Sequence, residues 1–156
     1  MLIAHLPAGY ICQRFFKNRL MQIGILIGSI LPDIDLIYFY TFGKRAILHH
    51  HYVTHMPIFW LCVTMLGIGF SFLIHKKYAT VFIGLLIGTS LHVFLDTVTG
   101  HVQWFQPFSE KELRFFDVNN KYAHWILNFI FHWTFLIEIT ITLIAGFFLL
   151  RRNKQH

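Results

Sequence analysis

The stretch Gly-Thr-Ser-Leu-His-Val-Phe-Leu-Asp-Thr-Val-Thr-Gly at residues 88–100 places His92 and Asp96 four residues apart in an otherwise apolar segment. On a helix, side chains at positions i and i+4 lie on one face, so the imidazole and the carboxylate point in the same direction. Burying ionisable groups among apolar side chains is costly unless they have partners. We therefore interpret the pair as two ligands for one cation. The alternative is a hydrogen-bonded pair that locks helix packing.

The composition is that of a membrane protein. A length of 156 residues fits one domain, which we place at residues 1–156. Hydrophobic residues make up 56% of the chain and charged residues 13%, whereas soluble domains have roughly 25% charged residues. The net charge of +6 comes from small basic clusters between apolar runs, so we predict no nucleic-acid partner.

Five apolar runs predict the helices. They cover residues 2–16, 20–42, 57–74, 79–98 and 125–150. The first run is too short, at about 1.5 Å per residue, to cross a hydrocarbon core of about 30 Å. Pro32 predicts that the second run ends or kinks near Leu31. The expected fold is all-α: a compact, multi-pass helical membrane bundle with about four to five membrane-embedded helices, some kinked or partial, and a C-terminal span at 125–150.

Basic residues predict the orientation. Eight of the thirteen lysines and arginines lie in the turn after the first run, at Lys76 and Lys77, and at the C-terminal end. Cytoplasmic connections are enriched in Lys and Arg. We therefore predict a multi-pass protein of the inner (plasma) membrane, with the histidine-rich side facing the extracytoplasmic space.

Ionisable residues from other segments are predicted to reach the same membrane face as His92 and Asp96. Asp33 and Asp35 lie about 22 Å along a helix from the basic turn, and His5 lies at a similar height on the other side of that turn. Further histidines in the two later connections are His49, His50, His51, His55 and His101. Divalent ions take carboxylate oxygen and imidazole nitrogen as ligands. The set predicts a metal site near the outer face.

Most of these residues also have a simpler interpretation. Either aspartate could cap the helix that follows, or one could cap while the other ligates, and Asp35 is then the better candidate ligand. The consecutive histidines could form a solvated tract, in which we favour His50 and His55 as ligands. His5 could be an ordinary interfacial residue.

Several short motifs lie within roughly residues 1–110. They are His5 before Gly9, Gly-Ser-Ile-Leu-Pro-Asp-Ile-Asp at 28–35, His50 with Thr54-His55, Leu91-His92 through Leu95-Asp96-Thr97, Thr99-Gly100, and Trp104 with Pro107-Phe108-Ser109. In combination they resemble the YdjM-like family of membrane-bound, metal-dependent hydrolases. That family is distantly similar to the zinc-dependent phospholipases C and related nucleases. The C-terminal third carries no matching motif.

The resemblance implies where metal would bind. The first site would comprise Asp35 or Asp33, one of His50 and His55, and the pair His92 and Asp96. A second ion would take His5, with Asp96 bridging, and His101 is a candidate for a further site. The family often has arginine after the first loop histidine, whereas this chain has His51.

We predict a membrane-embedded hydrolase that uses one or two divalent ions, zinc or manganese, to cleave a lipid or lipid-linked ester or phosphoester. Asp33 and His51 are the predicted acid–base residues. One alternative is a di-iron membrane oxidase of the desaturase type, suggested by His50, His51 and His55, although such enzymes need more histidine boxes. Another is a haem or metal carrier with His92 and His132 as axial ligands. The oligomeric state is left open.

Overall fold

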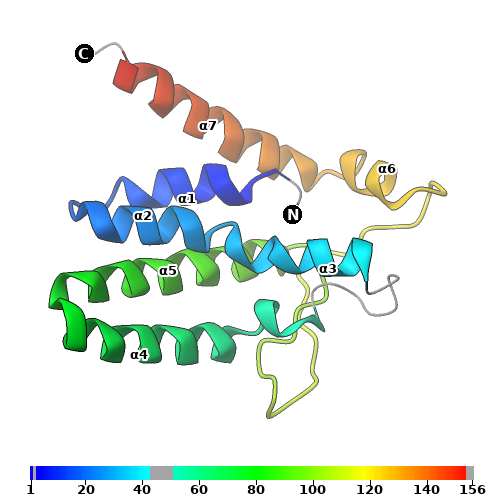
Figure 1. Ribbon diagram of the computed structural model, residues 1–156. Coiled ribbons are helices and arrows are strands. Elements are labelled where there is room, and N and C mark those ends of the chain that lie inside the picture. Colours follow the sequence, from blue (N-terminus) through cyan, green and yellow to red (C-terminus); the bar gives the residue numbers. More distant parts are fainter. Residues whose placement is uncertain (2, 43–50, 154–156) are drawn as a thin grey trace.

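The apolar runs fold into helices joined by turns and loops (Figure 1). The computed structural model describes residues 1, 3–42 and 51–153. Its α-helices are α1 (His5–Gln13), α2 (Arg19–Gly28), α3 (Asp35–Thr41), α4 (Pro57–Ile74), α5 (Ala79–Asp96), α6 (Trp125–Ile130) and α7 (Phe135–Asn153). The 3-10 turns are η1 (Leu31–Ile34), η3 (Val53–His55) and η4 (Lys76–Tyr78). Among the described residues the only β-type pairing is a single bridge between Val102 and Leu113, which confirms the all-α class.

Close packing of α2 against α5 forms the centre of the molecule. Gly24 and Gly28 on α2 meet Gly84 and Gly88 on α5, and both pairs have the spacing with which small residues let membrane helices approach closely. A Cβ atom on Gly88 would lie 2.3 Å from the carbonyl oxygen of Ile25. Because only hydrogen fits at these positions, the glycines fix where the ends of α2 and α5 lie.

The remaining long helices flank this pair. In Figure 1 the order across the molecule is α4, α5, α2, α1 and α7, with each helix in contact with the next. The loop after α5 projects beyond the first turns of α4. The carboxyl ends of α2 and α5 and the amino ends of α1 and α4 therefore meet at one end of the molecule.

The number of membrane spans is smaller than predicted. In the described part of the chain, two segments are long and apolar enough to cross a membrane, Pro57–Ile74 and Lys76–Asp96. The bent pair Arg19–Gly28 and Leu31–Tyr38, with an angle of 46°, makes a third if it is one span. The prediction of four to five membrane-embedded helices is therefore not supported, because α1 is short and the last apolar run is interrupted. The predicted break near Leu31 is present.

The run at 125–150 is two helices in the structure. α6 ends at Ile130, and α7 begins at Phe135. Between them His132 Nδ1 lies 2.8 Å from Thr134 Oγ1, and Thr134 is fully buried. Glu138, in the first turn of α7, is also fully buried.

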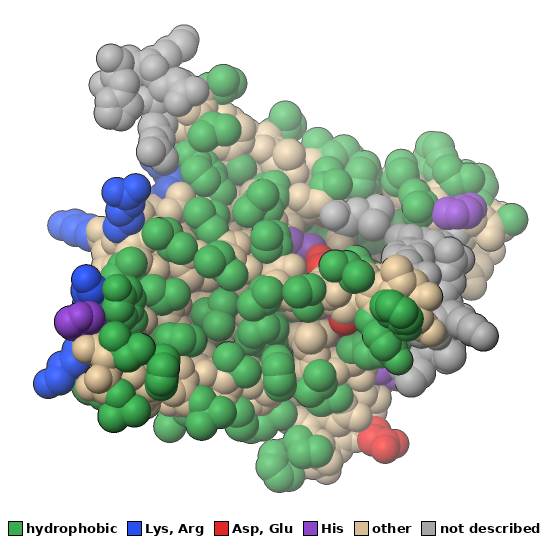
Figure 2. All heavy atoms as spheres, viewed as in Figure 1, with side chains coloured by type: hydrophobic (Ala, Val, Ile, Leu, Met, Phe, Trp, Pro, Cys, Tyr) green, Lys and Arg blue, Asp and Glu red, His purple; other side chains and the backbone are tan. Residues whose placement is uncertain are grey.

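Charge separates along the helices. Figure 2 shows Lys and Arg side chains gathered at the end of the molecule that holds η4 and the turn between α1 and α2. Apolar side chains cover most of the surface between this end and the opposite one. The acidic side chains visible in Figure 2 lie toward the opposite end, where α2 and α5 finish.

Candidate metal centre

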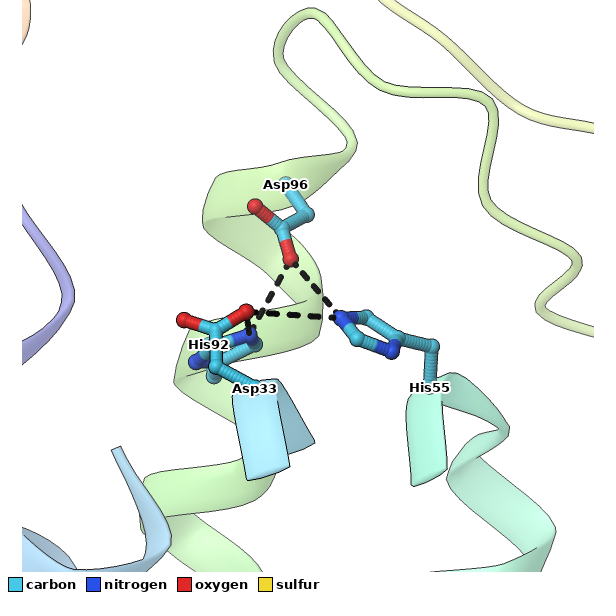
Figure 3. Close-up of side chains that lie close together, drawn as sticks. All are labelled: Asp33, His55, His92 and Asp96. Atoms are coloured by element: carbon cyan, nitrogen blue, oxygen red, sulfur yellow. Dashed lines mark ion pairs between the residues drawn. The ribbon is translucent and has the colours of Figure 1, made fainter. Parts of the chain in front are cut away.

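Four side chains from three segments converge at the end of α5 (Figure 3). η1 supplies Asp33, η3 supplies His55, and the last turn of α5 supplies His92 and Asp96. One ligand atom from each lies within 4.8 Å of all the others. The described residues contain no other group of this kind with such mutual distances.

The atoms alternate between nitrogen and oxygen. Asp96 Oδ2 lies 3.1 Å from His92 Nε2 and 3.4 Å from His55 Nε2. Asp33 Oδ1 lies 3.5 Å from His92 Nε2 and 3.9 Å from His55 Nε2. Figure 3 shows both imidazoles and both carboxylates directed toward the space between them. These nitrogen–oxygen distances leave room for an ion between the four atoms, as in a site whose ligands share one cation.

Both imidazoles are oriented by a hydrogen bond on their far nitrogen. His92 Nδ1 lies 2.8 Å from the carbonyl oxygen of Ser29, to which it can only donate. His55 Nδ1 lies 2.8 Å from Asp35 Oδ2, which also accepts from the Thr54 hydroxyl at 2.5 Å. A proton on Nδ1 leaves the Nε2 lone pair directed at the shared space, as in metal-binding histidines held by a carboxylate or a carbonyl.

Burial makes the cluster sensitive to charge. The side chains of His55 and His92 are fully buried and that of Asp96 is 2% exposed, whereas that of Asp33 is 32% exposed. Burial disfavours the charged form of His55, but its hydrogen bonds to Asp35 and Asp96 outweigh this effect and raise its pKa above the ordinary value. Asp33 therefore marks the side from which water and solutes reach the cluster.

The donor set fits a divalent ion. Two neutral imidazole nitrogens and two carboxylate oxygens are typical ligands of zinc and are also accepted by manganese. His92 Nε2 is buried and lies 3.1 Å from Asp96 Oδ2 and 3.5 Å from Asp33 Oδ1. A bound cation would accept this lone pair.

His5 lies beside the cluster and contacts the other oxygen of Asp96. Its ring stacks on His92 with a centroid distance of 3.7 Å, and its Nε2 lies 3.1 Å from Asp96 Oδ1. The amino group of Met1 pairs with the same oxygen. Burial outweighs the hydrogen bond with Asp96 and lowers the pKa of His5. Asp96 thus faces His55 and His92 with one oxygen and His5 with the other.

Glu138 holds the segment that precedes His5. Its Oε2 accepts hydrogen bonds from the backbone amides of Ile3, at 2.6 Å, and Ala4, at 3.2 Å. These contacts join α7 to residues more than 130 positions away in the sequence. Sequence reasoning assigned no role to Glu138, because only the packing of α7 against α1 brings the two segments together.

The other predicted site residues are placed as follows. Asp35 lies behind His55 and contacts its Nδ1, while Asp33 occupies the position among the four converging ligands. His51 Nε2 lies 2.9 Å from Glu112 Oε1, and His101 Nδ1 lies 2.7 Å from Glu112 Oε2. These two histidines therefore meet on Glu112, a residue that sequence reasoning missed. The predicted ligand His50 lies outside the described residues.

Neither aspartate caps a helix in the described structure. No side-chain hydrogen bond caps the start of η1 or α3. Both carboxylates instead face histidines. The capping alternative is thus not what the structure contains.

Comparison with known proteins identifies a family. A family model described as YdjM inner membrane protein matches residues 1–153. No curated protein and no solved structure shows significant similarity to the chain. The match extends beyond the motifs at 1–110 and includes α6 and α7.

Proposed function

The chain belongs to the YdjM inner membrane protein family, and we propose that it is a metal-dependent hydrolase acting on a lipid or lipid-linked ester or phosphoester. The observation that carries the proposal is the convergence of Asp33, His55, His92 and Asp96 within 4.8 Å, with both imidazoles oriented from behind. These four residues would hold one divalent ion, zinc or manganese. Asp35 would act on the ion only through His55.

Each residue has a distinct part in this proposal. A divalent ion in such a site supplies Lewis acidity and lowers the pKa of water. His55 and His92 would hold the ion through Nε2, since their Nδ1 atoms are engaged elsewhere. Asp33 turns one oxygen toward the cluster and the other away (Figure 3), and it is the most exposed of the four. We therefore assign to Asp33 the exchange of a proton with water or substrate.

His51 is the second proposed acid–base residue. Its pairing with Glu112 supplies the carboxylate partner that commonly orients an imidazole for proton transfer. His101 shares that carboxylate. We therefore group His101 with His51 and Glu112 and do not count it as a ligand of the ion.

A second ion would require His5. The ligands available to it are His5 and the Oδ1 atom of Asp96, so Asp96 would bridge the two ions. Metal stoichiometry separates the two forms of the proposal: one equivalent fits the four-residue site alone, and two equivalents require His5. A His5→Ala variant should then lose only the second equivalent.

The membrane setting supports a lipid substrate. The converging residues lie where α5, one of the two candidate spans, ends, and the surrounding helix surfaces are apolar. The resemblance to zinc-dependent phospholipases C favours a phosphoester. We further propose that the basic end faces the cytoplasm and the metal centre the extracytoplasmic space. In a variant without Cys12 and Cys62, a cysteine at Glu110 should react with an impermeant maleimide in intact cells, and one at Lys77 should not.

Elemental analysis of the purified protein tests the site. Wild-type protein should contain zinc or manganese, and Asp96→Ala should lose it without unfolding. Asp117→Ala is the matched control, since Asp117 is 73% exposed and pairs with Arg114 at the surface. Retained metal in Asp96→Ala would overturn the assignment. A Soret band or iron absorbance would instead favour the haem or oxidase alternative.

Vesicles of phosphatidylethanolamine and phosphatidylglycerol, labelled separately in the headgroup and the acyl chain, test the reaction. Metal-dependent release of a phosphorylated headgroup would support phosphoester hydrolysis, and release of fatty acid would support acyl-ester hydrolysis. A fully metal-loaded protein that releases neither would overturn hydrolysis of these lipids while leaving the metal site intact.

A further inference from the structure

An apolar pocket lies between the first turns of α4, the second half of α5 and the loop after α5. Its volume is about 360 Å³, within the range of roughly 300–1,000 Å³ typical of small-molecule sites. Its walls include Leu61, Leu86, Ser90, Trp104, Phe105 and Phe108. None of these residues belongs to the metal centre.

The pocket is continuous with the lipid-facing surface. α4 and α5 both lie in segments that are long and apolar enough to cross a membrane, and Leu61 on α4 is 44% exposed. Phe108 on the adjoining loop is 85% exposed. Figure 2 shows apolar side chains over α4 and on the loop that projects beyond it, beside an acidic side chain. A surface of this kind on helices that cross a membrane would face hydrocarbon.

Water is a poor occupant. A buried water needs two to four polar partners. The polar side chains of the lining are Ser90, Gln106 and Trp104, and the indole N–H of Trp104 already donates to Thr97 Oγ1. The remaining lining side chains are aliphatic or aromatic. A flexible hydrocarbon chain suits the apolar lining of the pocket, and it would enter from the hydrocarbon core of the bilayer.

The pocket and the metal centre share their supporting segments. Pro57, in the pocket wall, comes two residues after His55, and Ser90 comes two residues before His92. Trp104 Nε1 donates to Thr97 Oγ1 at 2.7 Å, and Thr97 directly follows Asp96. A chain in the pocket would therefore lie at the same end of α4 and α5 as the metal centre.

We propose that this pocket binds one acyl chain of a bilayer lipid. The identification of that lipid as the substrate rests on the function proposed above, whereas the binding of the chain does not. Trp104, in the pocket wall, supplies a direct probe, because lipids brominated on the acyl chain quench tryptophan on contact.

The test uses a protein in which Trp125 and Trp133 are replaced by phenylalanine, leaving Trp104 and the buried Trp60, which is 5% exposed. It is reconstituted in vesicles of phosphatidylcholine with or without bromine on the acyl chains. The same protein with Trp104→Phe gives the background from Trp60. The difference between the two proteins is the quenching of Trp104.

Filling the pocket should displace the chain. In Ser90→Leu, quenching of Trp104 should fall by about twofold or more, because the new side chain and the acyl chain occupy the same space. Leu61→Phe serves as a second filling variant should Ser90→Leu not fold. Gly69→Leu is the matched control on the same lipid-facing helices, since no atom lies within 4 Å of an added Cβ there. It should leave the quenching unchanged.

Three results would overturn the proposal. Quenching of Trp104 by aqueous acrylamide but not by brominated lipid would show a water-filled pocket. Protection from both quenchers would show that protein, such as a second copy of the chain, covers it. Equal lipid quenching of Trp104 in the parent protein, which lacks Trp125 and Trp133, and in both filling variants would place the lipid outside the pocket. None of these results depends on metal content or hydrolysis, so failure here and failure of the proposed function are distinguishable.

Discussion

Replacing Gly88 with alanine tests whether the crossing of α2 and α5 sets the geometry of the metal centre. The new Cβ atom would lie 2.3 Å from the carbonyl oxygen of Ile25 and 2.8 Å from the amide nitrogen of Ser29. Real Cβ atoms essentially never approach other atoms more closely than 3.0 Å. Because the contacted atoms belong to the backbone of α2, no rotamer change can relieve them. The two helices must separate locally by roughly 0.7 Å.

This separation should weaken metal binding more than folding. Alanine gains up to about 1 kcal/mol of helix propensity over glycine, and overpacking costs about 1–3 kcal/mol. The net loss in free energy of unfolding is therefore about 0–2 kcal/mol. Metal–ligand distances tolerate only about 0.2 Å, and Ser29 holds His92 in place. We expect the dissociation constant for zinc to rise about 10–100-fold, as when an outer partner of a metal ligand is removed.

The assay is competition for zinc with a chelator in detergent solution, with thermal unfolding measured on the same samples. Gly69→Ala is the control, because an added Cβ there meets no atom within 4 Å. The control should bind zinc like wild type and unfold at the same or a higher temperature. Wild-type zinc affinity in Gly88→Ala would refute the argument that the glycine crossing positions the ligands.

Three further predictions address the surroundings of the ion. Asp35→Asn should weaken zinc binding by about 10–100-fold, whereas Asp96→Ala should abolish it; equal losses in chelator competition would contradict the position of Asp35 behind His55. Zinc affinity should fall as the pH is lowered through the raised pKa of His55, because the ion must displace the imidazole proton. Calorimetry in buffers of different ionisation enthalpy counts the protons released, and a pH-independent affinity would argue against imidazole ligation. Glu138→Leu should lower the free energy of unfolding by about 1–3 kcal/mol, since two backbone amides lose their acceptor; Glu138→Gln keeps an acceptor and should lose less, and identical thermal unfolding of the two variants would contradict this role.

Local spacing made part of the structure predictable. Pro32 cannot continue a helix, so the break after α2 could be read from the sequence. His92 and Asp96 lie on one face of α5 because four residues make slightly more than one helical turn, and both are buried as expected. The meeting of these elements follows from another short pattern, glycines four residues apart at 24 and 28 and at 84 and 88. That pattern is visible in the sequence and could have paired α2 with α5.

Features set by long-range packing were not predictable. The positions of Asp33 and Asp35 depend on the 3-10 geometry of η1, which turns the first toward the shared space and the second toward the back of His55. Glu112 and Glu138 acquire partners only through loop and helix packing. The break between α6 and α7 is marked by no proline or glycine, so hydropathy alone extended the last span through it.

Charge balance explains why these groups can lie together at the end of a membrane helix. Asp33 and Asp96 bring two negative charges to a site with two imidazoles, and the charge of one divalent cation would balance them. Without the ion, the Met1 amino group and protons on the imidazoles supply the positive charge beside Asp96, and the pKa of His55 is raised accordingly. Protons and the metal ion would therefore compete for the same imidazole nitrogens, and either would supply positive charge beside the carboxylates. A second ion beside His5 would add two positive charges opposite a single shared carboxylate, so the balance of charge favours one ion at this centre.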